Sequence, residues 1–88
     1  MVLSFPNESR IYDARRDLIR FWGYDDAFEV CFFLEVAALD KLASRTGASD
    51  PSSYLEVFDA ARERIHRAAS KIYSRRGGNV HLLTAGRF

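Results

Sequence analysis

Four basic residues recur at intervals of three and four in the last third of the sequence, and their side chains could bind phosphate groups. They are Arg64, Arg67, Lys71 and Arg75. A helix turns by about 100° per residue, so this spacing places all four along one line of a helical surface. A row of guanidinium and ammonium groups suits the phosphate backbone of a nucleic acid.

The same row is equally typical of a solvated helix face. Glu63 precedes Arg67 by four residues, which is the order that favours an ion pair on a helix. Cations near the C-terminal end of a helix also interact favourably with its dipole. The sequence shows no helix-turn-helix pattern with a short turn. We therefore favour the solvated face and keep nucleic-acid binding as the alternative.

Three aromatic residues, Trp22, Tyr24 and Phe33, are the candidates for contact with another protein. Trp22 and Phe33, with His81 as a further candidate, are expected on the sheet face that points away from the core. Left uncovered, they would form an apolar patch that a symmetric dimer or stacked bases could cover. The third alternative, which we favour, is that the second helix covers this face.

Residues able to support catalysis or to bind a metal are few and scattered. His66, His81 and Cys31 include no closely spaced pair, so no metal site is predicted. We expect His66 in solvent beside the basic row, and Cys31 as a small buried apolar residue of a strand. The adjacent Asp25 and Asp26 fall in a predicted turn and are expected to face water. The sequence therefore predicts no enzymatic activity and no cofactor.

The basic row belongs to a helix predicted over residues 53–74. Asp50-Pro51, read as an N-cap followed by proline, and the alternative capping box of Ser53 with Glu56 both place its start within three residues of Ser52. Gly77-Gly78 supplies its stop. The apolar positions of this helix lie on one side and are predicted to dock onto a sheet: Phe58, Ala61, Ile65, Ala68, Ala69 and Ile72.

Short strands are predicted before and after the helices. The clearest is Ala27–Leu34, in which one face by period two carries Phe28, Val30, Phe32 and Leu34. A turn at Gly23–Asp26 joins it to the preceding strand. The other predicted elements are strands at Val2–Phe5, Ile11-Tyr12, Asp17–Gly23 and Val80–Leu83, a polar turn at Asp13–Arg16 and a short helix from about Glu35 to Ala43.

The order of these elements predicts an α+β fold. It comprises about four short, mostly antiparallel strands with one short and one long amphipathic helix, in the order roughly β-β-β-α-α-β. The 88 residues form a single domain, 1–88. The single cysteine allows no internal disulfide and points to a reducing compartment. We see no secretory signal and no apolar run of about 20 residues, so a cytoplasmic location without a membrane span is expected.

The charges are distributed unevenly along the chain. Residues 1–61 hold six Lys and Arg against eleven Asp and Glu, a balance of −5. Residues 62–88 hold seven against one, a balance of +6. Such a division is compatible with self-association, with binding of a polyanion, or with a basic helix end that an acidic turn region simply balances. We favour the last interpretation.

Several short segments, taken together in their order, are similar to one known family. They are Leu3–Asn7, Tyr12–Ala14, Ile19–Gly23, Phe58-Asp59 followed by Arg62–Ile65, and an ending with Leu83–Ala85 and Phe88. These segments resemble the small bacterial proteins catalogued as domain of unknown function 1488, over nearly the whole chain. The resemblance implies a single-domain α+β fold. It implies no established activity and no catalytic residues, although some members are loosely labelled transcriptional regulators.

Together these observations predict a non-enzymatic binding or regulatory module that acts through protein contacts. Trp22, Tyr24 and Phe33 would make the contact, with a second copy of the chain or another protein as partner. The alternative is a nucleic-acid-associated regulator that binds the phosphate backbone through the basic face of the long helix. Neither a membrane nor a cofactor is expected.

Overall fold

The computed structural model describes residues 3–6, 9–43 and 51–88. Its elements follow the order predicted from the sequence, with one helix more than expected. They are the strands β1 (Arg10–Asp13), β2 (Leu18–Asp25), β3 (Phe28–Glu35) and β4 (Val80–Leu83), the helices α1 (Val36–Ala43), α2 (Pro51–Ala60) and α3 (Arg62–Ile72), and the short 3₁₀ turns η1 (Arg75–Gly77) and η2 (Ala85–Arg87). The α+β class is confirmed.

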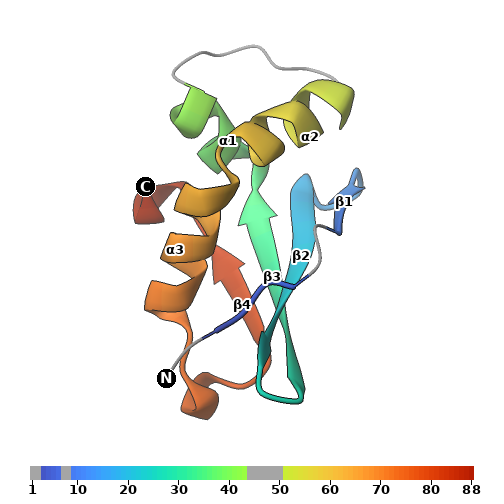
Figure 1. Cartoon of the computed structure of the whole chain (residues 1–88). Coiled ribbons are helices and arrows are strands. Elements are labelled where there is room, and N and C mark those ends of the chain that lie inside the picture. Colours follow the sequence, from blue (N-terminus) through green and yellow to red (C-terminus); the bar gives the residue numbers. More distant parts are fainter. Residues whose placement is uncertain (1–2, 7–8, 44–50) are drawn as a thin grey trace.

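The four strands form one mixed sheet in the order β1-β2-β3-β4 (Figure 1). The three N-terminal strands are antiparallel neighbours, as expected for consecutive strands joined by short turns. The last strand, β4, pairs with β3 in parallel and lies at the edge of the sheet. A parallel neighbour needs a long crossover, and the segment with α1, α2 and α3 supplies it.

The turns differ from the prediction in one place. Asp25 pairs with Phe28, so the β2–β3 turn consists of Asp26 and Ala27, and Gly23 lies inside β2. Asp26 has a φ of 55°, the left-handed conformation that such a tight turn demands and that Asp tolerates better than most residues. The predicted polar turn after β1 is confirmed, because Asp13 Oδ1 accepts hydrogen bonds from the backbone N–H groups of Arg15 and Arg16.

The prediction of one continuous helix over residues 53–74 is wrong. The helix is divided at Ala61, whose φ of −106° and ψ of 14° depart from helical values. The first part, α2, crosses one end of the sheet, and α3 runs along it (Figure 1). The predicted start is confirmed, since α2 begins at Pro51, while Asp50 lies outside the described residues.

The hydrophobic core lies between the helices and one face of the sheet. Every helix contributes to it, with Phe58 from α2 and Ile65 from α3 fully buried. The complete cluster is Ile19, Phe21, Val30, Phe32, Leu34, Ala38, Leu39, Val57, Phe58, Ile65, Ala68, Ala69 and Leu83. The predicted docking of the apolar helix side onto the sheet is thus confirmed.

Phe28 does not join this core. It was predicted to share a buried face with Val30 and Phe32, but its side chain is 68% exposed. The alternation of the strand is correct, and Phe28 simply lies beyond the helices, at the hairpin end of β3. Period-two patterning assigns a residue to a face, but it does not reveal where the covering layer ends.

Candidate functional site

The second face of the sheet carries a band of apolar side chains, which we call the open face. The side chains of this face alternate along the strands with the buried side chains. They are Ile11, Leu18, Arg20, Trp22, Tyr24, Glu29, Cys31, Phe33, Val80 and Leu82. Ile11 and Leu82 are each 50% exposed and Val80 is 56% exposed. In the part of the chain that the structure describes, the buried residues of all three helices pack against the opposite face. The expectation that the second helix covers the Trp22 face is therefore wrong.

The open face brings together the three residues predicted to make contacts. Trp22 and Tyr24 alternate along β2, and Phe33 lies across from Arg20 on β3, two pairs along from the Trp22–Cys31 pair. His81 is not among them, because its ring packs on the core side, stacked on Phe32 at 5.6 Å between centroids.

Three apolar members of this face, Ile11, Val80 and Leu82, are not among the residues predicted to make contacts. The alternation of β4 could have identified Val80 and Leu82. Successive side chains of a strand point to opposite faces, so these two lie on the face opposite to that of the fully buried Leu83. Ile11 had no such signal, since β1 contains no fully buried residue that would identify the two faces of the strand. The open face is thus a four-strand surface rather than the contribution of one hairpin.

Two arginines lie over aromatic rings of the open face. The guanidinium carbon of Arg20 is 5.0 Å from the centroid of the Trp22 ring, and that of Arg16 is 5.9 Å from the Phe33 ring. Both distances fall within the range of cation–π attraction. These contacts cover part of the rings, but they leave the outer apolar side chains exposed.

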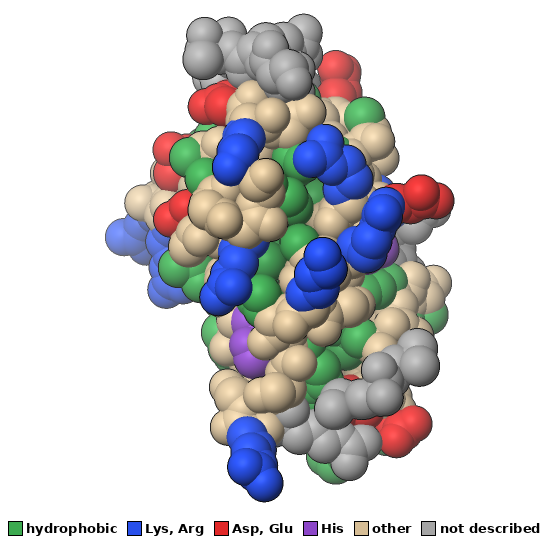
Figure 2. All heavy atoms as spheres, turned by 90° about the vertical axis from the view of Figure 1, so that its left-hand side faces the viewer, with side chains coloured by type: hydrophobic (Ala, Val, Ile, Leu, Met, Phe, Trp, Pro, Cys, Tyr) green, Lys and Arg blue, Asp and Glu red, His purple; other side chains and the backbone are tan. Residues whose placement is uncertain are grey.

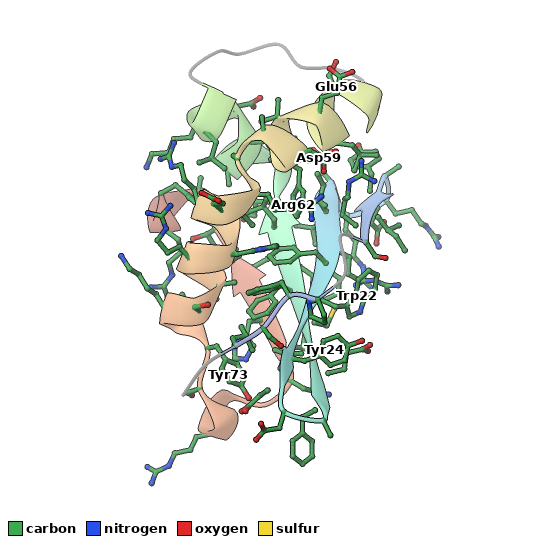
Figure 3. The ribbon with its side chains drawn as sticks, viewed as in Figure 1. Trp22, Tyr24, Glu56, Asp59, Arg62 and Tyr73 are labelled. Carbon is green, nitrogen blue, oxygen red and sulfur yellow. The ribbon has the colours of Figure 1, made fainter. Side chains whose placement is uncertain are left out.

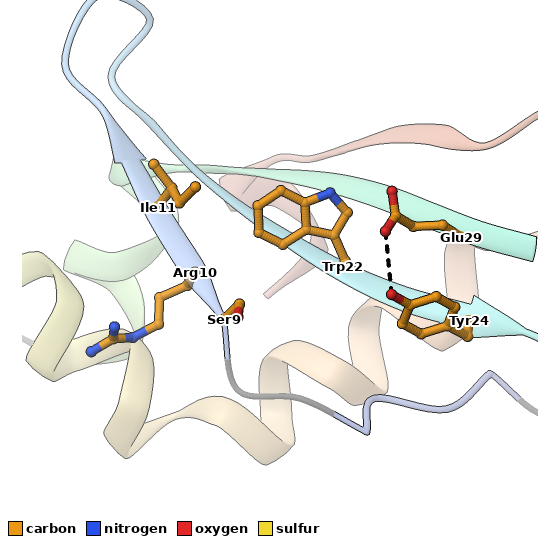
Figure 4. A pocket seen from close by; sticks show the side chains of 6 residues that line it. All are labelled: Ser9, Arg10, Ile11, Trp22, Tyr24 and Glu29. Carbon is orange, nitrogen blue, oxygen red and sulfur yellow. Dashed lines mark hydrogen bonds between the residues drawn. The ribbon is translucent and has the colours of Figure 1, made fainter.

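An edge hollow of about 450 Å³ opens beside β2 (Figure 4). It arises where the edge of the sheet is interrupted. The ladder of β1 stops at the Arg10–Phe21 pair, and the chain rejoins β2 only at the bridge between Ser4 and Tyr24. The lining residues are Ser9, Arg10, Ile11, Trp22, Tyr24 and Glu29.

The charge inside this edge hollow is negative. The Tyr24 hydroxyl donates a hydrogen bond to Glu29 Oε2 at 3.2 Å, and this bond raises the pKa of Tyr24. The guanidinium of Arg10 points away from Trp22 (Figure 4) and donates to both carboxylate oxygens of Asp59, at 2.9 and 2.8 Å. Glu29 is therefore the charged group that faces the hollow.

Asp59 serves the fold rather than this site. It accepts hydrogen bonds from Arg10 on β1 and from Arg62 at the start of α3, and these bonds hold its pKa below the usual range. Figure 3 shows Asp59 and Arg62 at the junction of the two helices. The network fastens the bend at Ala61 to the edge strand.

A second hollow, of about 190 Å³, lies on the outer side of α3, and we call it the basic hollow. Arg64, Arg67 and Lys71 line it as the sequence predicted, and Arg87 from η2 joins them. Figure 2 shows Lys and Arg side chains gathered on this side of the molecule. Arg87 could not be found from helical spacing, because the C-terminal turn brings it there. The side chain of Arg75 lies outside the described residues.

The predicted ion pair between Glu63 and Arg67 is absent. Within the described ranges, the ion pairs join Asp59 to Arg10 and to Arg62, and Asp13 to Arg16. No described ion pair thus joins the cations of the basic hollow to a carboxylate.

The residues considered for catalysis lie in different environments. His66, expected in solvent, is half-buried with its ring stacked on Phe5 at 3.8 Å, and burial lowers its pKa to about 4. Burial raises the pKa of the Cys31 thiol, which disfavours the nucleophilic thiolate. Asp25, expected to face water, is 3% exposed and accepts a hydrogen bond from the Tyr73 hydroxyl at 2.7 Å. Asp26 is exposed, as predicted.

No group of three or more potential metal ligands occurs among residues 3–6, 9–43 and 51–88. Nor does any helix within these ranges have both the length and the apolar character needed to cross a bilayer.

Comparison with known proteins places the chain in a family. The model of the family described as protein of unknown function (DUF1488) matches residues 3–83. The fold is similar to that in the crystal structure of a protein of unknown function from the same family, from Shewanella loihica PV-4. The TM-score is 0.76 at 18% sequence identity, over 90% of this chain and 89% of that one. No curated protein matches the chain. The breadth of the match and the shared fold agree, and the chain belongs to the DUF1488 family.

Proposed function

We propose that the protein is a small, non-enzymatic binding module, and that its open face contacts a second copy of the same chain. The observation that carries the proposal is the exposure of Ile11, Val80 and Leu82 on a face that no described helix covers. Soluble domains seldom leave contiguous apolar patches bare. Trp22 and Phe33 extend the band across the two central strands.

A second copy is the occupant that fits the physics of a small two-layer domain. A two-fold axis sets the same apolar band against itself, which requires no other partner. Two sheets packed face to face would form a sandwich between two helical layers. An 88-residue chain buries a modest fraction of its surface alone, so it gains stability from this burial.

The size of the face sets the expected strength of the dimer. Two strands of eight residues and two of four, at about 3.3 Å per residue and about 4.8 Å between strands, give a flat area of about 400 Å². Side-chain relief enlarges this area, but the contact remains at the lower end of specific interfaces. A micromolar rather than a nanomolar dimer is therefore expected.

Sedimentation velocity from about 5 to 500 μM tests the proposal. The wild-type protein should shift from monomer to dimer across this range. Leu82→Asp, which puts a charge into the apolar band, should stay monomeric, while Ser70→Asp on exposed α3 should dimerise like the wild type. Far-ultraviolet circular dichroism confirms that each variant is folded. A wild-type protein that remains monomeric at 500 μM contradicts the proposal.

A second candidate function is binding of a nucleic-acid backbone through the basic hollow. Arg87 favours it, because this residue adds a fourth cation from a distant segment to the row on α3. The exposed large apolar side chains of the described residues all lie on the strands, so this side lacks the exposed apolar residues that typically insert into lipid. A polyanion in water is the better match.

Fluorescence anisotropy with mixed-sequence oligonucleotides tests this second candidate. Binding should weaken steeply as salt rises, because displaced counterions return to the backbone. Arg67→Glu with Lys71→Glu should abolish it. Arg15→Glu with Arg76→Glu makes the same change in net charge outside the hollow and should reduce binding only weakly. A flat titration at low salt rules out the candidate.

A further inference from the structure

We infer that the edge hollow binds a guanidinium group, and that in the dimer this group comes from Arg15 or Arg16 of the second copy. The inference rests on the proposed face-to-face dimer and adds to it a specific polar contact. Apolar bands alone slide over one another, whereas a charged group seated in a hollow fixes one arrangement.

The lining of the edge hollow suits a planar cation. Trp22 and Tyr24 supply aromatic rings, and Glu29 supplies a carboxylate. Tyr24 occupies Oε2 of that carboxylate, and no described hydrogen bond reaches Oε1. A guanidinium can stack on an indole and donate to a carboxylate at the same time, which an ammonium cannot do equally well.

The same tryptophan already attracts a guanidinium within its own chain. Arg20 lies 5.0 Å from the ring centroid, so the indole interacts with such a group within cation–π range. Arg20 belongs to the row of side chains beside Ile11 and Phe33, farther from the hairpin end than Glu29. Arg20 therefore does not occupy the end of the hollow at Tyr24 and Glu29, where a guanidinium of another chain can bind.

Two-fold symmetry brings a basic turn to this end. The hollow lies over β1 and β2 near the β2–β3 hairpin, and the β1–β2 turn lies at the opposite end of the same two strands. An axis in the interface, perpendicular to the strands, reverses the strand direction and keeps β1 opposite β1. The turn of each copy then approaches the hollow of the other, and the contact occurs twice.

That turn carries two exposed arginines, Arg15 and Arg16. The guanidinium of Arg16 is held only loosely by Asp13, at 3.8 Å, and already reaches over Phe33 on the open face. Arg15 takes part in none of the described ion pairs. The acidic hollow and the basic turn are thus complementary surfaces of one face.

Trp22 makes the test direct, because it is the only tryptophan of the chain and reports on the hollow by its fluorescence. In sedimentation, Glu29→Gln should raise the dimer dissociation constant about a hundredfold, because the symmetric dimer loses the charge-assisted contact twice, at about tenfold each. Combined Arg15→Glu and Arg16→Glu should weaken the dimer likewise. Adding Glu29→Arg to that double variant should restore it. Glu63→Gln, which removes one carboxylate charge from exposed α3 and leaves the hollow intact, is the matched control and should dimerise like the wild type.

A small probe examines the hollow without the dimer. N-acetylarginine amide should quench Trp22 of the monomeric Leu82→Asp variant in a saturable way, and N-acetylcitrulline amide, a neutral analogue, should not. Glu29→Gln should abolish the quenching. If the wild type dimerises and none of these charge changes alters the dissociation constant, the inference is overturned and the proposed function stands. A monomeric wild type overturns the proposed function, and with it the arginine of the second copy. In either case the absence of saturable quenching by the arginine probe overturns the guanidinium site itself.

Discussion

At the scale of single residues, the most constrained position is Gly23, in the middle of β2. A Cβ atom there would lie 2.7 Å from Cε1 of Phe5, so only glycine lets that ring lie against the strand. Phe5 in turn lies 6.2 Å from the ring centroids of Phe21 and Phe32. The glycine that the sequence analysis assigned to a turn therefore makes room for the N-terminal segment.

Gly23→Ala should lower the free energy of unfolding by about 1–3 kcal/mol, because the added methyl group displaces the Phe5 ring. Urea denaturation measures the loss. In a Phe5→Ala background the same substitution should cost much less. Gly86→Ala, whose Cβ meets only Thr84 Oγ1 at 3.6 Å, is the control. Equal stability of Gly23→Ala and the wild type would show that the ring is not held there.

His66 gives the protein a pH dependence of definite sign. Burial lowers its pKa from 6.5 in the unfolded chain to about 4 in the folded one. Between these values the unfolded chain binds more protons, so stability falls as the pH falls from 6.5 to 4 and is fully present above 6.5. Because the ring is only half-buried, we expect a loss of about 1–2 kcal/mol after allowing for solvent screening.

Urea denaturation at pH 4, 5, 6 and 7 measures this loss. His66→Phe keeps an aromatic ring against Phe5 but cannot titrate, so its stability should fall less over the same range. Both proteins retain Asp59, whose lowered pKa makes its own contribution fall mainly below pH 3.8, so the difference between the two profiles reports on His66. Parallel pH profiles for the two proteins would refute the assignment to His66.

At the scale of elements, the helix boundaries that local chemistry determines were predictable. Pro51 begins α2, and Gly78 after η1 has a φ of 85°, the conformation that glycine favours. The break at Ala61 was not predictable, because alanine is the best helix former and carries no signal of a bend. The bend follows from packing, since α2 and α3 cover different parts of one core.

The same distinction applies to the candidate sites. Helical spacing identified Arg64, Arg67 and Lys71 because these residues share one element. It could not identify Arg87, which reaches them through β4 and η2. Likewise the alternation of side chains along the strands predicted that Trp22 and Phe33 share the open face. The edge hollow could not be predicted, because it depends on the residue at which β1 ends.

The docking of α3 after the bend can be measured separately from its charges. Ile65→Ala removes a fully buried side chain and should cost about 2–4 kcal/mol. Arg64→Ala, one residue earlier on the exposed side, should change the stability by less than about 0.5 kcal/mol. Guanidinium denaturation followed by circular dichroism compares the two. Similar losses in both variants would mean that α3 is not docked through its apolar side.

At the scale of the whole molecule, the two candidate surfaces belong to opposite layers. The open face is the bare side of the sheet, and the basic hollow lies on the outer side of the helical layer. A dimer through the sheets would therefore leave both basic hollows accessible. The charge division of the sequence agrees with this arrangement, because residues 62–88 hold seven basic residues and one acid.

Association through the open face should make thermal stability depend on concentration. A partner that binds only the folded chain stabilises it by mass action, so the melting temperature of the wild type should rise between 5 and 500 μM. Leu82→Asp should melt at one temperature throughout this range. Differential scanning fluorimetry with Trp22 follows both. Identical concentration dependence in the two proteins would place the interface elsewhere.

The parallel pairing of β3 with β4 has a consequence for the order of folding. Leu34 and its partner Leu83 are 49 positions apart, and closing so long a loop is slow. During synthesis the residues of β1, β2 and β3 are complete well before those of β4. The edge of β3 that pairs with β4 therefore has no partner until residue 83 has been made. A nascent chain therefore passes through a stage in which an unpaired, apolar strand is available to chaperones or to other nascent chains.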